Sequence, residues 1–308
     1  MLTAVTAHAG VPLQPHDLWS AWTVDPLVVA GLAAIAVAFA RGHRTGQPPR
    51  TGARARAWCV AAAIAAIAVA LLSPLDAASA SLASAHMLQH IVLILIAAPL
   101  VALGAPGGAI VRGAPAIVRW TLGRWRRPLR SIRTASRMPG APVAAWLVHV
   151  GTLWFWHASV PYDAAVRNDA VHAVEHLTLT VTAIFFWRAV LPPVGTSRVR
   201  NDPVGILLVF AMGLQSVFLS ALLTFATKPW YGVYAETVEA WGLTRLEDQQ
   251  IAGAIMWVPA SLFYVGAGLA LVVAWMRWSE RSAVRLAASP DSSEQARLSG
   301  DSSPLPQP

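Results

Sequence analysis

The sequence predicts an all-α integral membrane protein with seven transmembrane helices, its N-terminus outside and its C-terminus in the cytoplasm. Of the 308 residues, 56% are hydrophobic and only 12% are charged, about half the charged share of a soluble domain. The apolar residues form long blocks, and the basic residues fall between these blocks in an alternating pattern. Because the basic residues lie in short loops, the formal charge of +8 indicates membrane orientation and no nucleic-acid partner.

The apolar blocks set the number of spans. A helix needs about 20 apolar residues, with a range of roughly 17–25, to cross the hydrocarbon core of a bilayer. The first block is short and the fourth is marginal, whereas the others meet this length. The predicted spans are residues 26–40, 57–75, 86–103, 141–157, 171–191, 204–227 and 250–276.

The basic residues orient these spans. From the N-terminus to the C-terminus, the eight segments that flank the blocks contain 0, 5, 0, 8, 1, 3, 2 and 4 Lys or Arg residues, where the sixth segment is taken as residues 188–203 and includes Arg188 at the end of its block. Basic loops stay on the cytoplasmic side of a membrane. Seven spans fit this alternation, whereas six or eight would break it.

The chain divides into three parts. Residues 1–25 form an extracytoplasmic arm without Lys or Arg, in which we expect no secretory signal peptide. Residues 26–278 form the membrane domain, and residues 279–308 form a Ser/Pro-rich cytoplasmic tail that we expect to be disordered. The basic loop 104–140 is expected on the cytoplasmic lipid surface, with room for a short amphipathic helix. The single Cys59 excludes an internal disulfide and a CxxC metal site.

Five of the nine histidines converge on the outer ends of three predicted spans. Residues at positions i and i+4 share one helix face, so the two pairs with this spacing each present two imidazoles to one point. Ionisable residues within spans are costly and indicate function. We therefore predict a metal site formed by His86, His90, His157, His172 and His176. In contrast, His149 lies in mid-span and is interpreted as a hydrogen-bonding residue of the bundle interior.

Other polar residues lie near the same membrane face. Glu175 stands within the fifth-span histidine pair and Asp163 lies in the preceding loop, where carboxylates can orient imidazoles. Asp248 and Gln249 open the seventh span. Met256 lies on the same face as Gln249, about 10 Å deeper, either as a packing residue or as a soft ligand for Cu(I).

Three chemistries remain open for this site. The first is copper handling, because imidazoles with an optional thioether bind copper well. The second is zinc hydrolysis, because "HAVEH" at residues 172–176 has the H-x-x-E-H pattern in which the glutamate activates a zinc-bound water. The third is a bis-histidine haem, with His90 paired to His157 or His176.

Four blocks of the sequence resemble a known family. They read "HMLQHIVLILIAAPLVALGAP", "WFWHASVPYDAAVRNDAVHAVEHLTL", "LLTFATKPWYGVYA" and "DQQIAGAIMWVPA". In this order, over roughly residues 25–278, they are similar to signature blocks of the multi-span cytochrome c oxidase assembly factor CtaG family.

The resemblance implies a multi-pass protein of the bacterial plasma membrane that matures a haem–copper oxidase. The implied role is delivery of copper to the oxidase catalytic subunit, with a copper donor protein as a further partner and no enzymatic activity. A metal-free assembly scaffold is the alternative role. By motif, the functional positions that carry over are His86, His90, His157, Tyr162, Asp163, His172, Glu175, His176, Asp248 and Gln249.

Overall fold

The computed structural model describes residues 13–45, 52–125, 138, 140–196 and 203–287. These residues form helices and no β-strand, which confirms the all-α class. By length and composition, six of the described helices can cross a membrane, and the number rises to seven if one bent helix pair counts as a span. The orientation of the termini stays a prediction.

The long helices follow the predicted apolar blocks. They are α1 (Pro26–Arg44), α2 (Ala53–Leu72), α9 (Ala141–His157), α11 (Asp169–Val190), α12 (Pro203–Thr224) and α13 (Arg245–Ala287). The third span is a continuous run of α4 (Ala83–Ile91), the π-helix η2 (Val92–Ala97) and α5 (Ala98–Gly104). The short helices are η1 (Pro15–Ser20), α3 (Pro74–Ser79), α6 (Gly107–Gly113), α7 (Ala116–Arg124), α10 (Ser159–Arg167) and η3 (Val238–Trp241).

The predicted fourth span corresponds to a bent helix pair. Helix α9 has 17 residues and coincides with the predicted block 141–157, but α10 follows it at an angle of 72°. Pro161 explains the break, because it has no N–H to donate to the carbonyl oxygen of His157. That carbonyl instead accepts a hydrogen bond of 3.2 Å from the hydroxyl of Tyr231.

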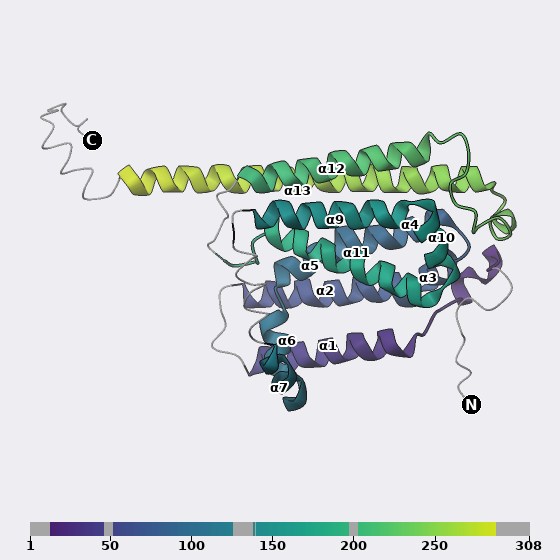
Figure 1. Cartoon of the computed structure of the whole chain (residues 1–308). Helices are drawn as coiled ribbons and strands as arrows, with labels where there is room; N and C mark the ends of the chain where they lie inside the picture. The colour runs from purple at the N-terminus through teal and green to yellow at the C-terminus, as the bar shows by residue number, and fades with distance from the viewer. Residues whose placement is uncertain (1–12, 46–51, 126–137, 139, 197–202, 288–308) are drawn as a thin grey trace, which may run out of the picture.

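The third span is the centre of the bundle. In its most apolar stretch 61% of the residues are buried, against 11–39% in the other candidate spans. Helix α4 packs against α3 and α13, and α5 packs against α2 and α11 (Figure 1). In the π-helical segment, which precedes Pro99, the buried indole of Trp187 donates a hydrogen bond of 3.0 Å to the carbonyl of Ile94. A π-helical turn of this kind is frequent near functional sites.

The remaining helices lie around this centre. Helix α1 lies at the edge of the bundle and packs against α6 (Figure 1). Gly42 and Gly113 permit this close contact, because a Cβ atom on either residue would collide with backbone of the other helix. Helices α12 and α13 run side by side, and α13 continues past residue 278 to Ala287. Residues 288–308 of the expected tail lie outside the described part.

The basic loop 104–140 contains α6 and α7, where the sequence allowed one short helix. Helix α7 exposes apolar side chains such as Ile117 and Trp120 beside its arginines. This mixture is compatible with the expected position at a lipid surface.

Candidate metal centre

Helix α4 contributes the first histidine pair. His86 and His90 are separated by one helical turn and are both buried, 0% and 3% exposed. Their Nε2 atoms lie 3.0 Å apart, so one imidazole donates a hydrogen bond to the other. The i, i+4 spacing therefore brings both rings to one point, as the sequence predicts.

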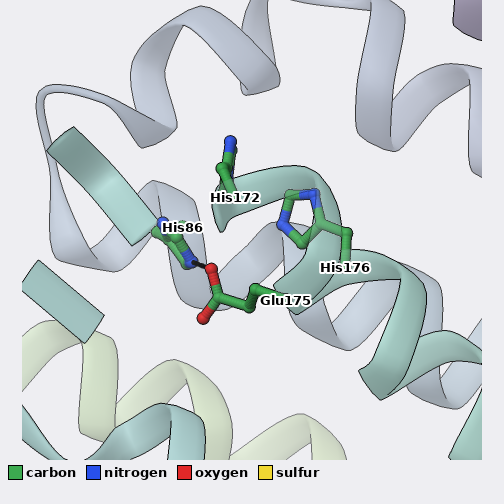
Figure 2. Close-up of side chains that lie close together, drawn as sticks. All are labelled: His86, His172, Glu175 and His176. Carbon is green, nitrogen blue, oxygen red and sulfur yellow. Dashed lines mark ion pairs between the residues drawn. The ribbon is translucent and has the colours of Figure 1, made fainter. Parts of the chain in front are cut away.

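Helix α11 presents the second pair and a carboxylate. Figure 2 shows His172, Glu175 and His176 of this helix near His86. His176 and Glu175 are buried and His172 is half-buried. The two carboxylate oxygens of Glu175 face different histidines of α4. Its Oε2 lies 3.3 Å from His86 Nε2, and its Oε1 lies 3.6 Å from His90 Nε2. Glu175 thus lies between the two α4 imidazoles rather than behind them.

His157 adds a third helix to the cluster. Its ring centroid lies 5.8 Å from that of His90. Its Nδ1 lies 2.7 Å from the carbonyl oxygen of Leu153. A carbonyl can only accept, so Nδ1 carries the proton and the lone pair of the neutral ring is on Nε2. A backbone carbonyl that fixes the tautomer in this way is typical of metal-binding histidines.

The arrangement fits a metal ion. His86, His172, Glu175 and His176 each offer a ligand atom, and these atoms lie within 4.8 Å of one another. The Nε2 atoms of His157 and His176 and both oxygens of Glu175 are buried without a hydrogen bond. Buried polar groups are costly when they lack partners. A metal ion would satisfy these donors, and nitrogen with carboxylate oxygen suits zinc and copper.

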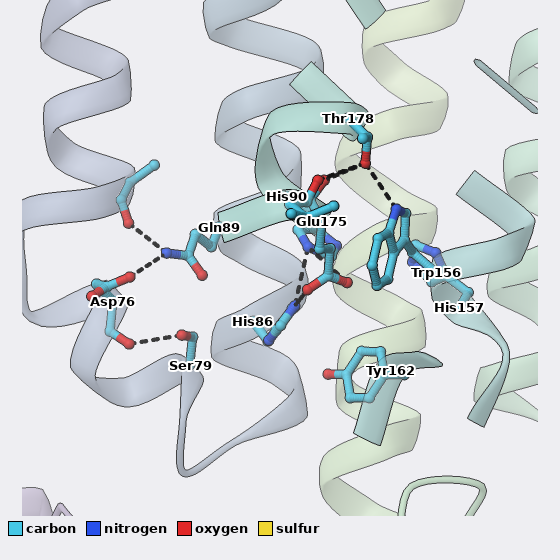
Figure 3. A network of polar contacts seen from close by, with 12 residues as sticks. Asp76, Ser79, His86, Gln89, His90, Trp156, His157, Tyr162, Glu175 and Thr178 are labelled. Carbon is cyan, nitrogen blue, oxygen red and sulfur yellow. Dashed lines mark hydrogen bonds and ion pairs between the residues drawn. The ribbon is translucent and has the colours of Figure 1, made fainter. Parts of the chain in front are cut away.

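A group of tyrosines covers the cluster at the bend after α9. The ring of Tyr162, on α10, lies 4.9 Å from the ring of His86, and Figure 3 shows both residues. It also stacks on the ring of Tyr231 at 3.8 Å. Its hydroxyl donates to the hydroxyl of Tyr234 at 3.0 Å, which donates to the carbonyl of Ser79 at 3.0 Å. Burial raises the pKa of Tyr231 and of Tyr234 well above the usual value, so both phenols stay neutral.

Asp248 and Gln249 position the elements around the cluster. Asp248 Oδ2 accepts a hydrogen bond of 2.6 Å from the Ala83 amide, and Oδ1 accepts one of 3.1 Å from the Ser84 amide. It therefore caps the N-terminus of α4 from the beginning of α13. Gln249 accepts a hydrogen bond of 2.5 Å from the amide of Trp230, which fixes the segment that carries Tyr231 and Tyr234.

Three other residues singled out in the sequence are not in the group of four ligand residues. Met256 is 7% exposed and packs in the apolar core of the bundle. Asp163 forms an ion pair of 3.7 Å with Arg167 and is not in the group of four ligand residues. His149 Nδ1 lies 2.9 Å from the hydroxyl of Thr182, which confirms that it is a hydrogen-bonding residue of the interior.

Sequence reasoning did not single out Tyr231 and Tyr234. Both lie in "LLTFATKPWYGVYA", a block that carries the family resemblance. The available signal was the presence of two tyrosines, three residues apart, in the segment that connects two predicted spans. Their contact with α10 depends on the bend after α9, which the sequence pattern did not indicate.

Comparison with known proteins identifies a family for this chain, but no solved structure that matches it. The model of the family described as cytochrome c oxidase caa3 assembly factor matches residues 33–278. Uncharacterised proteins of Mycobacterium bovis and Mycobacterium tuberculosis are each 26% identical over 277 residues, which are 86% of this chain and 40% of theirs. One of Mycobacterium leprae is 26% identical over 286 residues, 88% of this chain and 42% of its own. The chain thus spans about two fifths of these relatives' length. No solved structure matches it.

Proposed function

This chain belongs to the family of cytochrome c oxidase caa3 assembly factors, the family that its sequence blocks resemble, and we propose that it holds copper for insertion into the catalytic subunit of a haem–copper oxidase. Copper is then the cargo, and the chain turns over no substrate. Because the curated relatives are more than twice as long, the cargo and partner are inferred from the site of this chain.

The observation that carries this proposal is the proximity of five imidazoles and one carboxylate from three helices, of which the carboxylate and four of the imidazoles are buried. The Nε2 atoms of His157 and His176 are buried without a hydrogen bond, and the two rings lie 5.8 and 5.3 Å, respectively, from the ring of His90. Nitrogen donors bind copper more tightly than other divalent first-row metals. A cluster that only stabilised the bundle would be expected to satisfy its own polar atoms.

The predicted topology gives the direction of delivery. The cluster lies at the end of the bundle where α4 and α11 begin and α9 ends. By the alternation of basic loops, this end faces outward from the cytoplasm. In the plasma membrane of a bacterium, copper would reach the cluster from a donor protein on the outer side, and the oxidase subunit would receive it within the bilayer.

Metal analysis tests the cargo. The full chain is purified in detergent, exposed to copper, washed and measured for copper, zinc and iron. We expect the unaltered chain to retain copper and the His86→Ala/His90→Ala variant to lose it. His149→Ala is the matched control, because it removes a buried imidazole outside the cluster, and it should retain copper.

The other outcomes point to the alternatives. Bound zinc with loss of a hydrolytic activity in Glu175→Gln would indicate the H-x-x-E-H hydrolase. A coloured protein with bound iron would indicate a haem cytochrome. Absence of metal from every variant would overturn the copper role and leave the metal-free scaffold.

A cellular assay tests the role in assembly. In a strain that lacks this chain, oxidase activity and the copper content of the oxidase should fall. The unaltered chain and His149→Ala should restore both, whereas His86→Ala/His90→Ala should not. Full restoration by the double variant would contradict copper delivery.

A further inference from the structure

The cluster has two tiers along the helix axes. Helices α4 and α11 each carry histidines at positions i and i+4, so the second histidine of each pair lies about 6 Å further along its helix. The first tier contains His86 and His172, whose ring centroids are 5.1 Å apart. The second tier contains His90 and His176, 5.3 Å apart, together with His157, 5.8 Å from His90.

Glu175 connects the tiers. Its Oε2 lies nearest His86 of the first tier and its Oε1 nearest His90 of the second, as Figure 3 shows. Neither oxygen has a hydrogen bond, and the residue is 0% exposed. A buried carboxylate with one oxygen toward each of two histidine sets has the arrangement of a bridging ligand.

The number of donors exceeds what one ion takes. Five imidazoles and one carboxylate give six donor groups, whereas a protein-bound zinc or copper ion normally takes about four strong ligands. The group of four residues within mutual reach of one ion takes His176 together with the first tier and does not include His90 or His157. The ring of His176 lies 5.8 Å from that of His86 and 5.3 Å from that of His90, so His176 can serve either position. His90 and His157 remain available for a second ion, and the closer ring of His176 completes their set.

We propose that the cluster holds two copper ions, one in each tier, with the carboxylate of Glu175 bridging them. The first tier supplies His86, His172 and Glu175 Oε2, and the second supplies His90, His157, His176 and Glu175 Oε1. This inference rests on the proposed function, because it takes copper as the cargo. Side-by-side ions about 3.5–4 Å apart are known in two-metal protein sites.

The two tiers differ in exposure and in ligand number. His172 is half-buried, whereas all three histidines of the second tier are buried. The first tier has fewer protein ligands and therefore leaves more coordination sites open. It is the position through which copper enters and leaves, and the second tier retains its ion for longer.

Stoichiometry and magnetic coupling test the proposal on the full chain in detergent, loaded with Cu(II). Two ions per chain are expected, with a paramagnetic resonance intensity well below that of the copper present, because the bridge couples the two unpaired electrons. His172→Asn should retain one ion with full intensity. The second-tier variant His90→Asn/His157→Asn should lose one ion, and His149→Asn should match the unaltered chain.

Glu175→Gln isolates the bridge, because an amide has one oxygen and cannot connect two ions as a carboxylate does. Any copper that this variant retains should show the full resonance intensity. One ion per chain in the unaltered protein would overturn the two-tier proposal and leave the copper role intact. No bound copper would overturn the proposed function itself. Elution of each variant as the unaltered chain from a sizing column excludes misfolding as the cause.

Discussion

An aspartate side chain caps the N-terminus of both α1 and α4, but one aspartate is adjacent in sequence and the other comes from a distant helix. Asp25 directly precedes α1, and its Oδ1 accepts hydrogen bonds from the amides of Leu27 and Val28, at 2.7 and 3.3 Å. Helix α4 has Leu82 at this position, which gives no side-chain cap, and Asp248 of α13 caps it instead. The cap of α1 can therefore form from local sequence alone, whereas the cap of α4 forms only when α13 packs against α4.

The two spans that begin with these helices also differ in how much they depend on the rest of the bundle. The span of α1 is 11% buried at a mean hydropathy of 1.6, whereas the span that begins with α4 is 61% buried at 2.2. The more apolar span thus carries the histidines and lies at the centre. Mean hydropathy identifies both as spans, but the polar residues at the beginning of α4 identify the one with a function.

The largest expected difference comes from enlarging a small residue in each span. Ala98 of α5 is 0% exposed, so Ala98→Leu overpacks the centre and should destabilise the chain by about 2 kcal/mol. Ala34→Leu in α1 places its side chain on an exposed face and should have little effect. Thermal unfolding in detergent measures both. Equal losses would show that α1 is packed as tightly as the third span.

Removing the two caps compares their origins directly. Asp248→Ala leaves two buried amides of α4 without an acceptor, and should destabilise the chain by about 1–2 kcal/mol. It should also weaken copper retention, because α4 carries His86 and His90. Asp25→Ala removes an exposed cap, should cost about 0.5–1 kcal/mol and should leave copper content unchanged. A copper effect of Asp25→Ala would contradict the separation of these regions.

The π-helical segment offers a smaller test. Trp187→Phe keeps an aromatic ring but removes the hydrogen bond to the carbonyl of Ile94, and should cost about 1 kcal/mol. Trp58 is 75% exposed on α2, so Trp58→Phe should leave the unfolding temperature unchanged. The same shift in both variants would show that the indole–carbonyl bond contributes nothing.

The smallest expected effect concerns the tyrosine cover. Tyr162→Phe retains the ring beside His86 and removes only the hydroxyl that donates to Tyr234. Stability should fall by about 0.5–1 kcal/mol, and the amount of bound copper should stay the same while its rate of uptake rises. Copper content and uptake are followed by elemental analysis at timed intervals. Loss of bound copper would instead indicate that the hydroxyl acts within the metal site.

Much of the membrane architecture could be predicted, because long apolar runs have few alternatives to a helix. The block 141–157 coincides with α9, and His86 with His90 came together because helical periodicity is local. The cap from Asp248 could not be predicted, since it joins residues 165 positions apart. The short helix α10 lies in a segment that was expected to be a loop, and α3 covers the end of the predicted block 57–75 and the beginning of the loop after it.

The place of Glu175 shows a second limit of the pattern. Its position between two histidines of one helix suggested a residue that orients imidazoles. The structure instead directs its two oxygens toward α4, a relation that depends on how α4 and α11 pack. Sequence spacing predicts which residues share a face of one helix. Which residues of a neighbouring helix they contact depends on how the two helices pack.

The short α9 also has a consequence for the surrounding lipid. At 17 residues it is about 25 Å long, less than the roughly 30 Å of a typical hydrocarbon core. Helix α10 turns away from α9 at an angle of 72°, so it adds little to the length of this candidate span. Such a mismatch is relieved by local thinning of the bilayer. If α9 crosses the bilayer, the histidine at its end would then lie nearer the headgroups than the length of the other candidate spans suggests.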